Sequence, residues 1–504
     1  MNYLKKSVAL LLVAVMVLAL AACGSKSSSS SSSSAANSSS SSSDGSSSSD
    51  SSSSLYSKDT REILIGTWYE QYYTSDHQSV DDNPSVTNLI NAQMQLDNMR
   101  AIEKKYNIEL RFWNMTWQGV IESINTSIMA GKPDCAVYLV DLQFGIPAVL
   151  AGYAMSLEEI LQRDAKASLV DEAHKDIFSD AGSVVVKTLN LSPGSADTYL
   201  FSANAINLAA YPLGYNSDLI KKYGLEDPAD LMAKGEWTWD KWRTMMKAIT
   251  QDTDSDGATD QWGFRGAWNV LFPALLMSNN AHIASPIKGE DGKVHEMLTS
   301  QPTIEALNFL HDMYQVDKVS FWDPDCDANW NYNVYAWAKQ NIGFWVDQAW
   351  IAQEADPDQV MLKNRCVVTW PVGPSGNKDT NPMFNQTVGS YYIIPAGTED
   401  AQQVYCVMYD FFNWYAGDTT LRDDDEWYRN WTYTDANFEV LKSMADEAKD
   451  YTMELWDQVP YDEALTIRAI IETGNSPDFQ PIDVSTFVEA NKNRVEDYVN
   501  KLFN

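Results

Sequence analysis

Cysteine and histidine are scarce in this chain of 504 residues, which contains five of each. Apart from Cys23, the cysteines Cys135, Cys326, Cys366 and Cys406 lie far apart, with no C-x-x-C pair and no histidine at ligand spacing. This spacing gives no indication of a cysteine-based metal site. It leaves two alternatives for the four later cysteines, which are one or two disulfides or isolated buried thiols.

Sequence motifs of common hydrolases and nucleotide-binding enzymes are also absent. The chain has no G-x-S-x-G, no H-E-x-x-H and no P-loop glycine pattern. The histidines, which are scattered without mutual spacing, are His77, His174, His282, His295 and His311. Acidic residues are plentiful, but no two of them stand out as the carboxylate pair of a glycosidase. The sequence therefore identifies no catalytic residues, and an extracellular carbohydrate-active enzyme stays open as an alternative reading.

Positive charge is in deficit, since 36 basic residues face 69 acidic residues for a formal net charge of −33. Such a surface repels nucleic acid and anionic lipid headgroups. We therefore expect no nucleic-acid partner. The same charge keeps an exported protein soluble, so it says little about the choice of ligand.

Long apolar runs are limited to one, at residues 8–22, which follows Lys5 and Lys6. A basic start followed by a short apolar run is typical of a secretory signal peptide, here residues 1–22. The run ends in Leu-Ala-Ala-Cys-Gly, which resembles the bacterial lipobox and makes Cys23 the expected lipidated first residue of the mature chain. No later run is long enough to cross a membrane.

Serine dominates the next segment, since 23 of the 30 residues from Ser25 to Ser54 are serine. A segment with almost nothing to bury cannot repay the entropy cost of folding. We therefore predict that residues 23–57 are a flexible tether between the lipid anchor and a folded region.

The folded region opens with alternating strand and helix patterns. Residues 62–68, 108–112 and 135–140 read as strands, and residues 88–106 and 117–129 read as helices. This β-α-β-α-β order predicts a parallel sheet covered by helices. Further helices are expected after Ser156, which opens a capping box, and over residues 239–249 with Thr238 as N-cap.

A series of short motifs follows in a characteristic order. They are Gly131-Lys132-Pro133-Asp134, Tyr215-Asn216-Ser217-Asp218-Leu219, Thr238-Trp239-Asp240-Lys241-Trp242, DTDSDGATDQWGF at residues 252–264, Asn341-Ile342-Gly343-Phe344-Trp345, Trp370-Pro371-Val372-Gly373-Pro374, and Val388-Gly389-Ser390-Tyr391-Tyr392-Ile393-Ile394. Over residues 60–504 the chain thereby resembles the family 1 extracellular solute-binding proteins of ABC importers, the group that contains maltose-binding protein. It departs from the family at Ser217, where lysine is common, and in the loose segment 199–201.

The resemblance implies an α/β, two-lobed periplasmic-binding-protein-like fold with hinge strands and a ligand cleft between the lobes. Lobe 1 would take residues 58–206 and 389–425. Lobe 2 would take residues 207–388, with C-terminal helices at residues 426–504 mainly in the same lobe. The chain would cross between lobes near residues 207–211 and 387–391.

Aromatic residues are abundant, with 18 tryptophans, all of which follow the tether. A pyranose has an apolar face and a rim of hydroxyls, so sugar sites combine flat aromatic rings with polar side chains. Trp117 is among the aromatics of the expected cleft loops, and the candidate partners of the hydroxyl rim are Asp141, Glu70 and Asn269. The ligand-binding residues that the family position favours are Trp68, Tyr69, Glu70, Asp141, Trp268, Trp345, Trp350, Tyr391 and Trp431.

The stretch DTDSDGATD resembles a calcium loop, because carboxylates at positions 1, 3 and 5 with glycine at position 6 fold around one ion. The candidate ligands are Asp252, Asp254, Asp256, the carbonyl of Ala258, and Asp260. Position 12, which is glutamate in an EF-hand, is Gly263 here. The loop is therefore at best EF-hand-like, and an acidic solvated turn without metal is the alternative.

Together these features predict a monomeric, non-enzymatic receptor that is lipid-anchored on the extracellular face of a Gram-positive type cell membrane. The resemblance implies a carbohydrate ligand, with an oligosaccharide favoured, and delivery to ABC permease subunits. Peptides and lipids stay open as ligands. A third reading is a protein that presents its ligand to a membrane sensor kinase. The only cofactor predicted is a structural Ca²⁺.

Overall fold

The computed structural model describes residues 60–69, 72–83, 86, 89–162, 170–176, 198–201, 211–266, 268–285, 289–321, 341–347, 364–376, 391–422, 429, 432, 434–450, 468–471 and 481–503. All of them belong to one compact unit, Lys58–Asn504. The predicted signal peptide, Cys23 and the tether lie outside the described residues.

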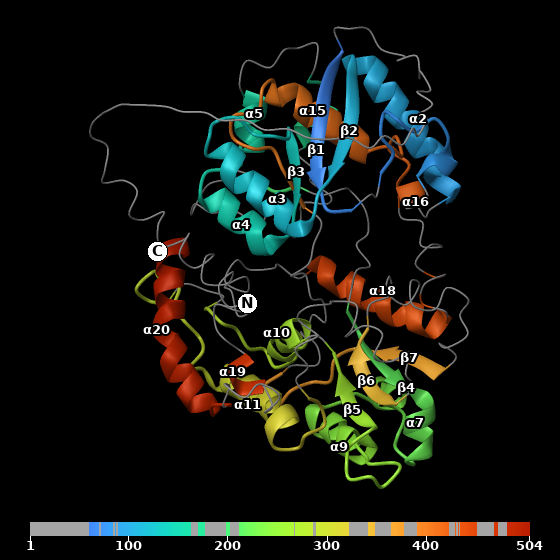
Figure 1. The fold of residues 1–504 in the computed structure, drawn as a ribbon, viewed down its shortest axis with the longest axis vertical. Helices are drawn as coiled ribbons and strands as arrows, with labels where there is room; N and C mark the ends of the chain where they lie inside the picture. The colour runs from blue at the N-terminus through green and yellow to red at the C-terminus, as the bar shows by residue number, and fades with distance from the viewer. Residues whose placement is uncertain are drawn as a thin grey trace, which may run out of the picture. The chain divides into compact units, whose positions relative to one another are not determined.

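The first lobe is built on a four-stranded sheet whose strand order is β2-β1-β3-β8 (Figure 1). Its strands are β1 (Arg61–Thr67), β2 (Ile108–Asn114), β3 (Val137–Val140) and β8 (Tyr391–Ile393). β1 pairs in parallel with both β2 and β3, and β8 joins β3 in the antiparallel direction. The parallel sheet predicted from the β-α-β-α-β order is confirmed.

Helices cover both faces of this sheet, as Figure 1 shows. They are α2 (Leu89–Tyr106), α3 (Trp117–Ser123), which continues as a π-turn (Ile124–Ile128), α4 (Leu142–Leu150), α5 (Leu157–Gln162), α15 (Ala401–Phe412) and α16 (Thr419–Arg422), with short 3-10 turns at Val80–Asp82 and Ala173–Asp176. One buried cluster joins the strands to α2 and α15, and another joins the opposite face to α3 and α4. Strand residues that point to alternate faces feed both clusters.

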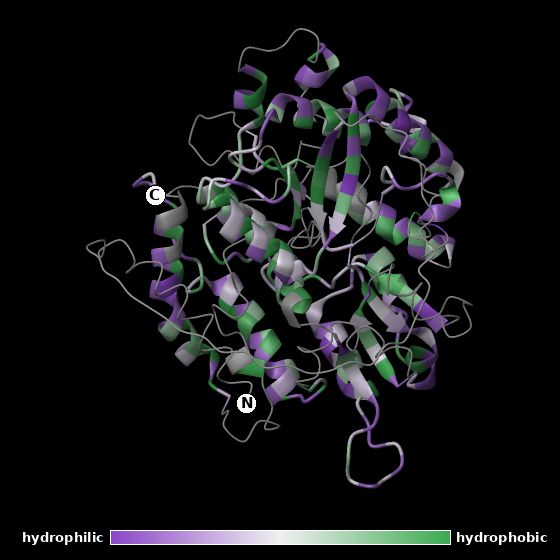
Figure 2. Ribbon diagram, turned by 45° about the horizontal axis from the view of Figure 1, so that its top comes forward, coloured by the Kyte–Doolittle hydropathy of each residue, from purple (hydrophilic) through white to green (hydrophobic). Residues whose placement is uncertain are grey.

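The second lobe contains a second four-stranded sheet, of order β5-β6-β4-β7. Its strands are β4 (Leu213–Asn216), β5 (Trp262–Arg265), β6 (Ile342–Val346) and β7 (Arg365–Val368). β5 and β6 run in parallel, while β4 is antiparallel to both β6 and β7. Figure 2 shows hydrophobic and hydrophilic residues mixed along these strands and mainly hydrophilic residues on the projecting loop after α9.

The helices of the second lobe come from two separate parts of the chain. They are α7 (Ser217–Lys222), α8 (Pro228–Lys234), α9 (Trp239–Ile249), α10 (Trp268–Ser278) and α11 (Gln301–Gln315), followed later by α18 (Asp435–Asp450), α19 (Arg468–Ile471) and α20 (Val484–Phe503). Residues of all three late helices share one buried cluster with β4, β5 and α9. The C-terminal helices therefore pack in the second lobe.

The chain passes from the first sheet to the second and back. Phe201 forms a bridge with Tyr392 beside β8, and β4 of the second sheet begins at Leu213. The return falls between β7 and β8. Most residues of both predicted crossings, 207–211 and 387–391, lie outside the described residues, so the domain boundaries stay predictions.

Helices α5 and α9 begin where the sequence predicted. The Ser156 hydroxyl accepts a hydrogen bond from the Glu159 backbone N–H at 3.2 Å and so caps α5, as predicted. Thr238 stands at the N-cap of α9 as predicted, and α9 ends at Ile249. The Thr238 side chain makes no capping hydrogen bond, so packing of α9 rather than its cap stabilises this start.

The described cysteines Cys135, Cys366 and Cys406 are free thiols. Cys135 and Cys406 are buried, and burial raises the pKa of each of these thiols to about 12. Such thiols are inert at neutral pH. Among the described residues no helix is long and apolar enough to cross a membrane.

Candidate functional site

The carboxyl ends of β1 and β3 bring several predicted ligand residues together in the first lobe. Trp68 and Tyr69 follow β1 directly and are half-buried. Their rings meet edge to face, with centroids 5.6 Å apart. Thr67 Oγ1 donates to the Tyr69 carbonyl at 3.1 Å and fixes the chain as it leaves the strand. The carboxyl end of parallel strands is the edge where open α/β sheets place ligands.

Asp141 follows β3 and caps the next helix. Its Oδ1 accepts the backbone N–H of Phe144 at 3.2 Å, which satisfies a free donor at the start of α4. Its Oδ2 accepts the indole Nε1–H of Trp117 at 2.9 Å. The residue is only 3% exposed. Both carboxylate oxygens are therefore engaged by groups of the protein itself.

Trp117 is the first residue of α3, and backbone pairing brings the start of this helix to the end of β1. The Met115 N–H donates to the Thr67 carbonyl at 2.7 Å, which ties the end of β2 to the end of β1. Phe144 contacts both tryptophans edge to face, with centroids 5.5 Å from Trp117 and 5.9 Å from Trp68. These rings, Trp68, Tyr69, Trp117 and Phe144, are called the first-lobe aromatic cluster.

Trp345 lies in β6 of the second lobe and is buried. Its indole Nε1–H donates to Asp347 Oδ2 at 3.0 Å, and its ring packs over Gly214 of β4. The same carboxylate oxygen accepts the Nε–H of Arg365 at 2.7 Å, and Arg365 also pairs with the other oxygen. The ring is thus buried on the second sheet over Gly214 and held by Asp347, and its role toward a ligand stays a prediction.

Tyr391 lies in β8 and is buried against the cluster under α3 and α4. Burial raises the pKa of its hydroxyl well above the ordinary value, because the anion would lose its hydration. Trp268 begins α10, but its side chain is outside the description, as is that of Asn269. Glu70, Trp350 and Trp431 lie outside the described residues.

Phe144 is the member of the cluster that the sequence alone did not single out, and Trp117 received no specific role. A signal for Phe144 exists in the sequence. An aspartate that follows a buried strand and precedes Phe144 by three residues is placed to cap a helix, which brings the ring close to the strand end.

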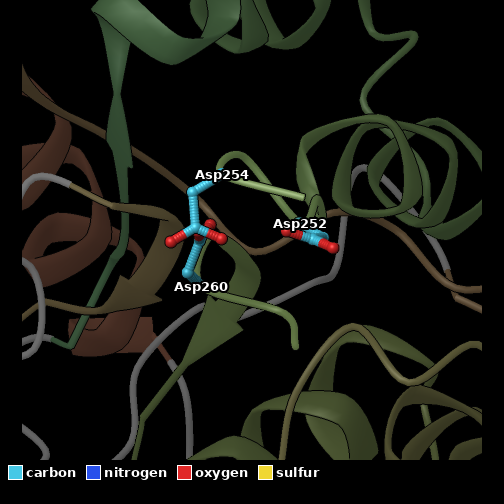
Figure 3. A group of neighbouring side chains, drawn as sticks. All are labelled: Asp252, Asp254 and Asp260. Carbon is cyan, nitrogen blue, oxygen red and sulfur yellow. The ribbon is translucent and has the colours of Figure 1, made fainter. Parts of the chain in front are cut away.

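The acidic loop projects between α9 and β5. A bridge between Gln251 and Gln261 closes it, and Ser255 and Gly257 adopt positive φ. The carboxylates of Asp252, Asp254 and Asp260 have oxygens within 4.8 Å of one another. Figure 3 shows these three side chains on the loop. Mutual approach of three like charges is what a divalent cation compensates.

The remaining predicted ligands of this loop are arranged differently. The Asp256 carboxylate accepts the backbone N–H of Ala258 at 2.8 Å, and Asp256 does not belong to the close group. Backbone N–H groups of Gly257 and Ser255 donate to Asp252 and lower the pKa of its carboxyl. Hard carboxylate oxygens of this kind fit Ca²⁺.

The packing of α9 on β5 explains why glycine stands at residue 263, the position that corresponds to the EF-hand glutamate. A Cβ at this residue of β5 would stand 2.8 Å from the carbonyl carbon of Met246 in α9. The colliding atom belongs to backbone, so it cannot move aside as a side chain would. A twelfth-position carboxylate is therefore excluded here by the packing of α9 on β5.

The fold and the strand-end aromatic cluster define the class of two-lobed α/β binding proteins. The family model for the bacterial extracellular solute-binding protein matches residues 83–420, which is more than half of the chain. The chain belongs to this family, as its sequence motifs predicted.

Solved structures support the same fold. The maltose/maltodextrin-binding domain MalE from Bdellovibrio bacteriovorus, bound to maltotriose, is 13% identical with a TM-score of 0.51 and covers 87% of this chain and 100% of its own. The GacH receptor of Streptomyces glaucescens is 14% identical with a TM-score of 0.52, covering 87% and 99%. Lmo0181 from Listeria monocytogenes, in complex with cycloalternan, is 12% identical with a TM-score of 0.53, covering 88% and 100%. No curated protein sequence matches the chain.

Proposed function

We propose that this solute-binding protein is a receptor that binds a carbohydrate, with an oligosaccharide favoured, and delivers it to an ABC importer. The observation that carries the proposal is the first-lobe aromatic cluster at the carboxyl ends of β1 and β3. Flat rings at this edge match the apolar face of a pyranose, and polar groups around them would bind its hydroxyls.

The ligands of similar folds support the carbohydrate class. MalE was solved with maltotriose, GacH with acarbose, and Lmo0181 with cycloalternan, all of which are oligosaccharides or their analogues. The low identity of these proteins leaves the particular sugar open. We propose that no bond of the sugar is broken and that uptake is driven by ATP hydrolysis in separate importer subunits.

We further propose that the chain is lipidated at Cys23 and held at the extracellular face of the cell membrane by the serine-rich tether. Lys5, Lys6, the apolar run and the small residues before Cys23 support this. A structural Ca²⁺ at Asp252, Asp254 and Asp260 is proposed from the approach of their carboxylates. The Asp256 carboxylate and the backbone carbonyl of Ala258 are proposed as additional ligands. The task of the ion would be to stiffen the loop before β5.

The test is isothermal titration calorimetry of the full-length chain in mild detergent against maltotriose, acarbose and cycloalternan, with calcium present. Each sugar is then recovered and chromatographed. We expect saturable binding of at least one sugar, which is recovered intact. Recovery of cleaved sugar would contradict a pure binding function. Absence of binding to all three would argue against the favoured oligosaccharide ligand and direct the search to other sugars, to peptides or to a sensory partner.

A further inference from the structure

Trp117 combines exposure with immobility, which is unusual for a surface tryptophan. The residue is 40% exposed. Its indole N–H is nevertheless bonded to the buried carboxylate of Asp141, and its ring packs against Phe144 at an interplanar angle of 82°. The N-cap of α3 is satisfied as well, since Thr116 Oγ1 accepts the Gly119 N–H at 3.0 Å. An exposed ring is thus held at both its polar edge and its backbone.

A ring fixed in this way suits a binding platform. Binding costs free energy for each side chain that must be immobilised, and a ring already held in place avoids this cost. When a ligand covers an exposed aromatic ring, the burial of apolar surface also favours binding. The neighbouring rings Phe144 and Trp68 extend the apolar surface along the carboxyl edge of the sheet.

Asp141 has the opposite character, because it is almost fully shielded from water. Its two oxygens accept from Phe144 N–H and Trp117 Nε1–H. A carboxylate that is only 3% exposed is poorly placed to bond a ligand hydroxyl directly. It is well placed to orient the indole, since a charged acceptor makes a stronger hydrogen bond than a neutral one.

We propose that Trp117 is a ligand-contacting residue that stacks on the apolar face of a sugar ring, and that Asp141 is the residue that positions it. The inference rests on the proposed carbohydrate-binding function and deepens it. It changes the expected role of Asp141 from a partner of ligand hydroxyls to a support for the indole.

Trp113 provides a comparison within the same lobe. It lies at the end of the edge strand β2 and is 45% exposed, so it resembles Trp117 in exposure. It lies in a strand rather than at a capped helix start. If exposure alone made a ligand platform, Trp113 and Trp117 would be equivalent.

The binding test uses the full-length chain in mild detergent, with maltotriose, acarbose and cycloalternan as probes in calorimetric titrations. The variants are W117A, W117F, D141N and the double variant W117F/D141N. Asparagine caps a helix about as well as aspartate, so D141N keeps a cap for α4 while it loses one of the two charged acceptors. W262F is the control, because Trp262 lies at the amino end of β5 and packs on Phe321.

We expect W117A to raise the Kd of a bound probe about tenfold or more, and D141N to raise it severalfold. W117F has no indole N–H for Asp141 to accept. D141N is therefore expected to cost little further affinity in the W117F background, which is the signature of two residues acting as a unit. W262F and W113A are expected to bind like the unmodified chain.

A spectroscopic test needs no ligand. In protein labelled with 5-fluorotryptophan, the ¹⁹F resonance of Trp117 is assigned by its loss in W117F and that of Trp262 by its loss in W262F. D141N is expected to shift or broaden the Trp117 resonance and to leave the Trp262 resonance in place.

The outcomes separate the two proposals. Probe binding that W117A leaves unchanged, or that W113A weakens as much as W117A does, would overturn the inference while the receptor function stands. Additive losses in the double variant, or an unshifted Trp117 resonance in D141N, would overturn the positioning role. Failure of every probe to bind the unmodified chain would contradict the proposed function and the stacking role with it.

Discussion

At the scale of single residues, the ion pair between Asp347 and Arg365 in the second lobe carries a large cost of desolvation. Both side chains are almost fully shielded from water. The Asp347 carboxylate also accepts the indole N–H of Trp345. Two desolvated charges are tolerated because each satisfies the other, so the removal of one leaves the second without compensation.

The variant R365M is therefore expected to lower the free energy of unfolding by about 3–5 kcal/mol, because it strands the Asp347 charge in the protein interior. Urea unfolding followed by circular dichroism measures the change. K241M removes the exposed ion pair of Lys241 with Glu226 and is expected to leave stability nearly unchanged. Equal effects of the two variants would contradict the distinction between buried and exposed pairs.

At the scale of elements, the loop between α9 and β5 shows how packing limits a motif. Its carboxylates Asp252, Asp254 and Asp260 converge, while Gly263 lies against the backbone of α9 and leaves no room for a side chain. The loop can therefore offer an ion the carboxylates of Asp252, Asp254 and Asp260. It cannot offer a bidentate carboxylate at residue 263.

Calcium is expected to raise the melting temperature of the full-length chain by about 2 °C or more over a chelator control, since an ion that binds only the folded state stabilises it. Differential scanning fluorimetry with and without chelator measures this. The double variant D252N/D254N is expected to abolish the difference. D230N, which changes an exposed aspartate of α8, is the matched control and should keep it. If calcium does not change the melting temperature of the unmodified chain, the calcium site is contradicted and the loop is an acidic turn.

At the scale of the whole molecule, the chain combines a folded solute-binding protein with an N-terminal segment of a different composition. The family match covers residues 83–420, and the serine-rich segment precedes it. In the proposed arrangement the lipid retains the receptor near its importer, and the tether sets how far the folded part can move from the bilayer.

C23A is expected to move the protein from the membrane fraction to the medium or to a soluble extract, because a free chain has no acyl group to bury. Fractionation of cells that express the unmodified chain or C23A, with immunoblotting, measures the distribution. C135A is the control, since Cys135 is a buried thiol of the folded part. Membrane retention of C23A equal to that of the unmodified chain would contradict lipid anchoring at this residue.

The sequence by itself determined the class of fold and the family. The β-α-β-α-β order, the end of α9 and the place of the acidic loop could all be predicted, because they depend on periodicity, caps and turn residues that act over a few positions. The convergence of Trp68, Asp141 and Trp117, residues from three separate segments, was decided by the tertiary structure. So was the burial of Trp345 over Gly214. An indole looks the same in sequence whether it packs in a core or meets solvent, because only strand register and helix packing decide which residues share its surroundings.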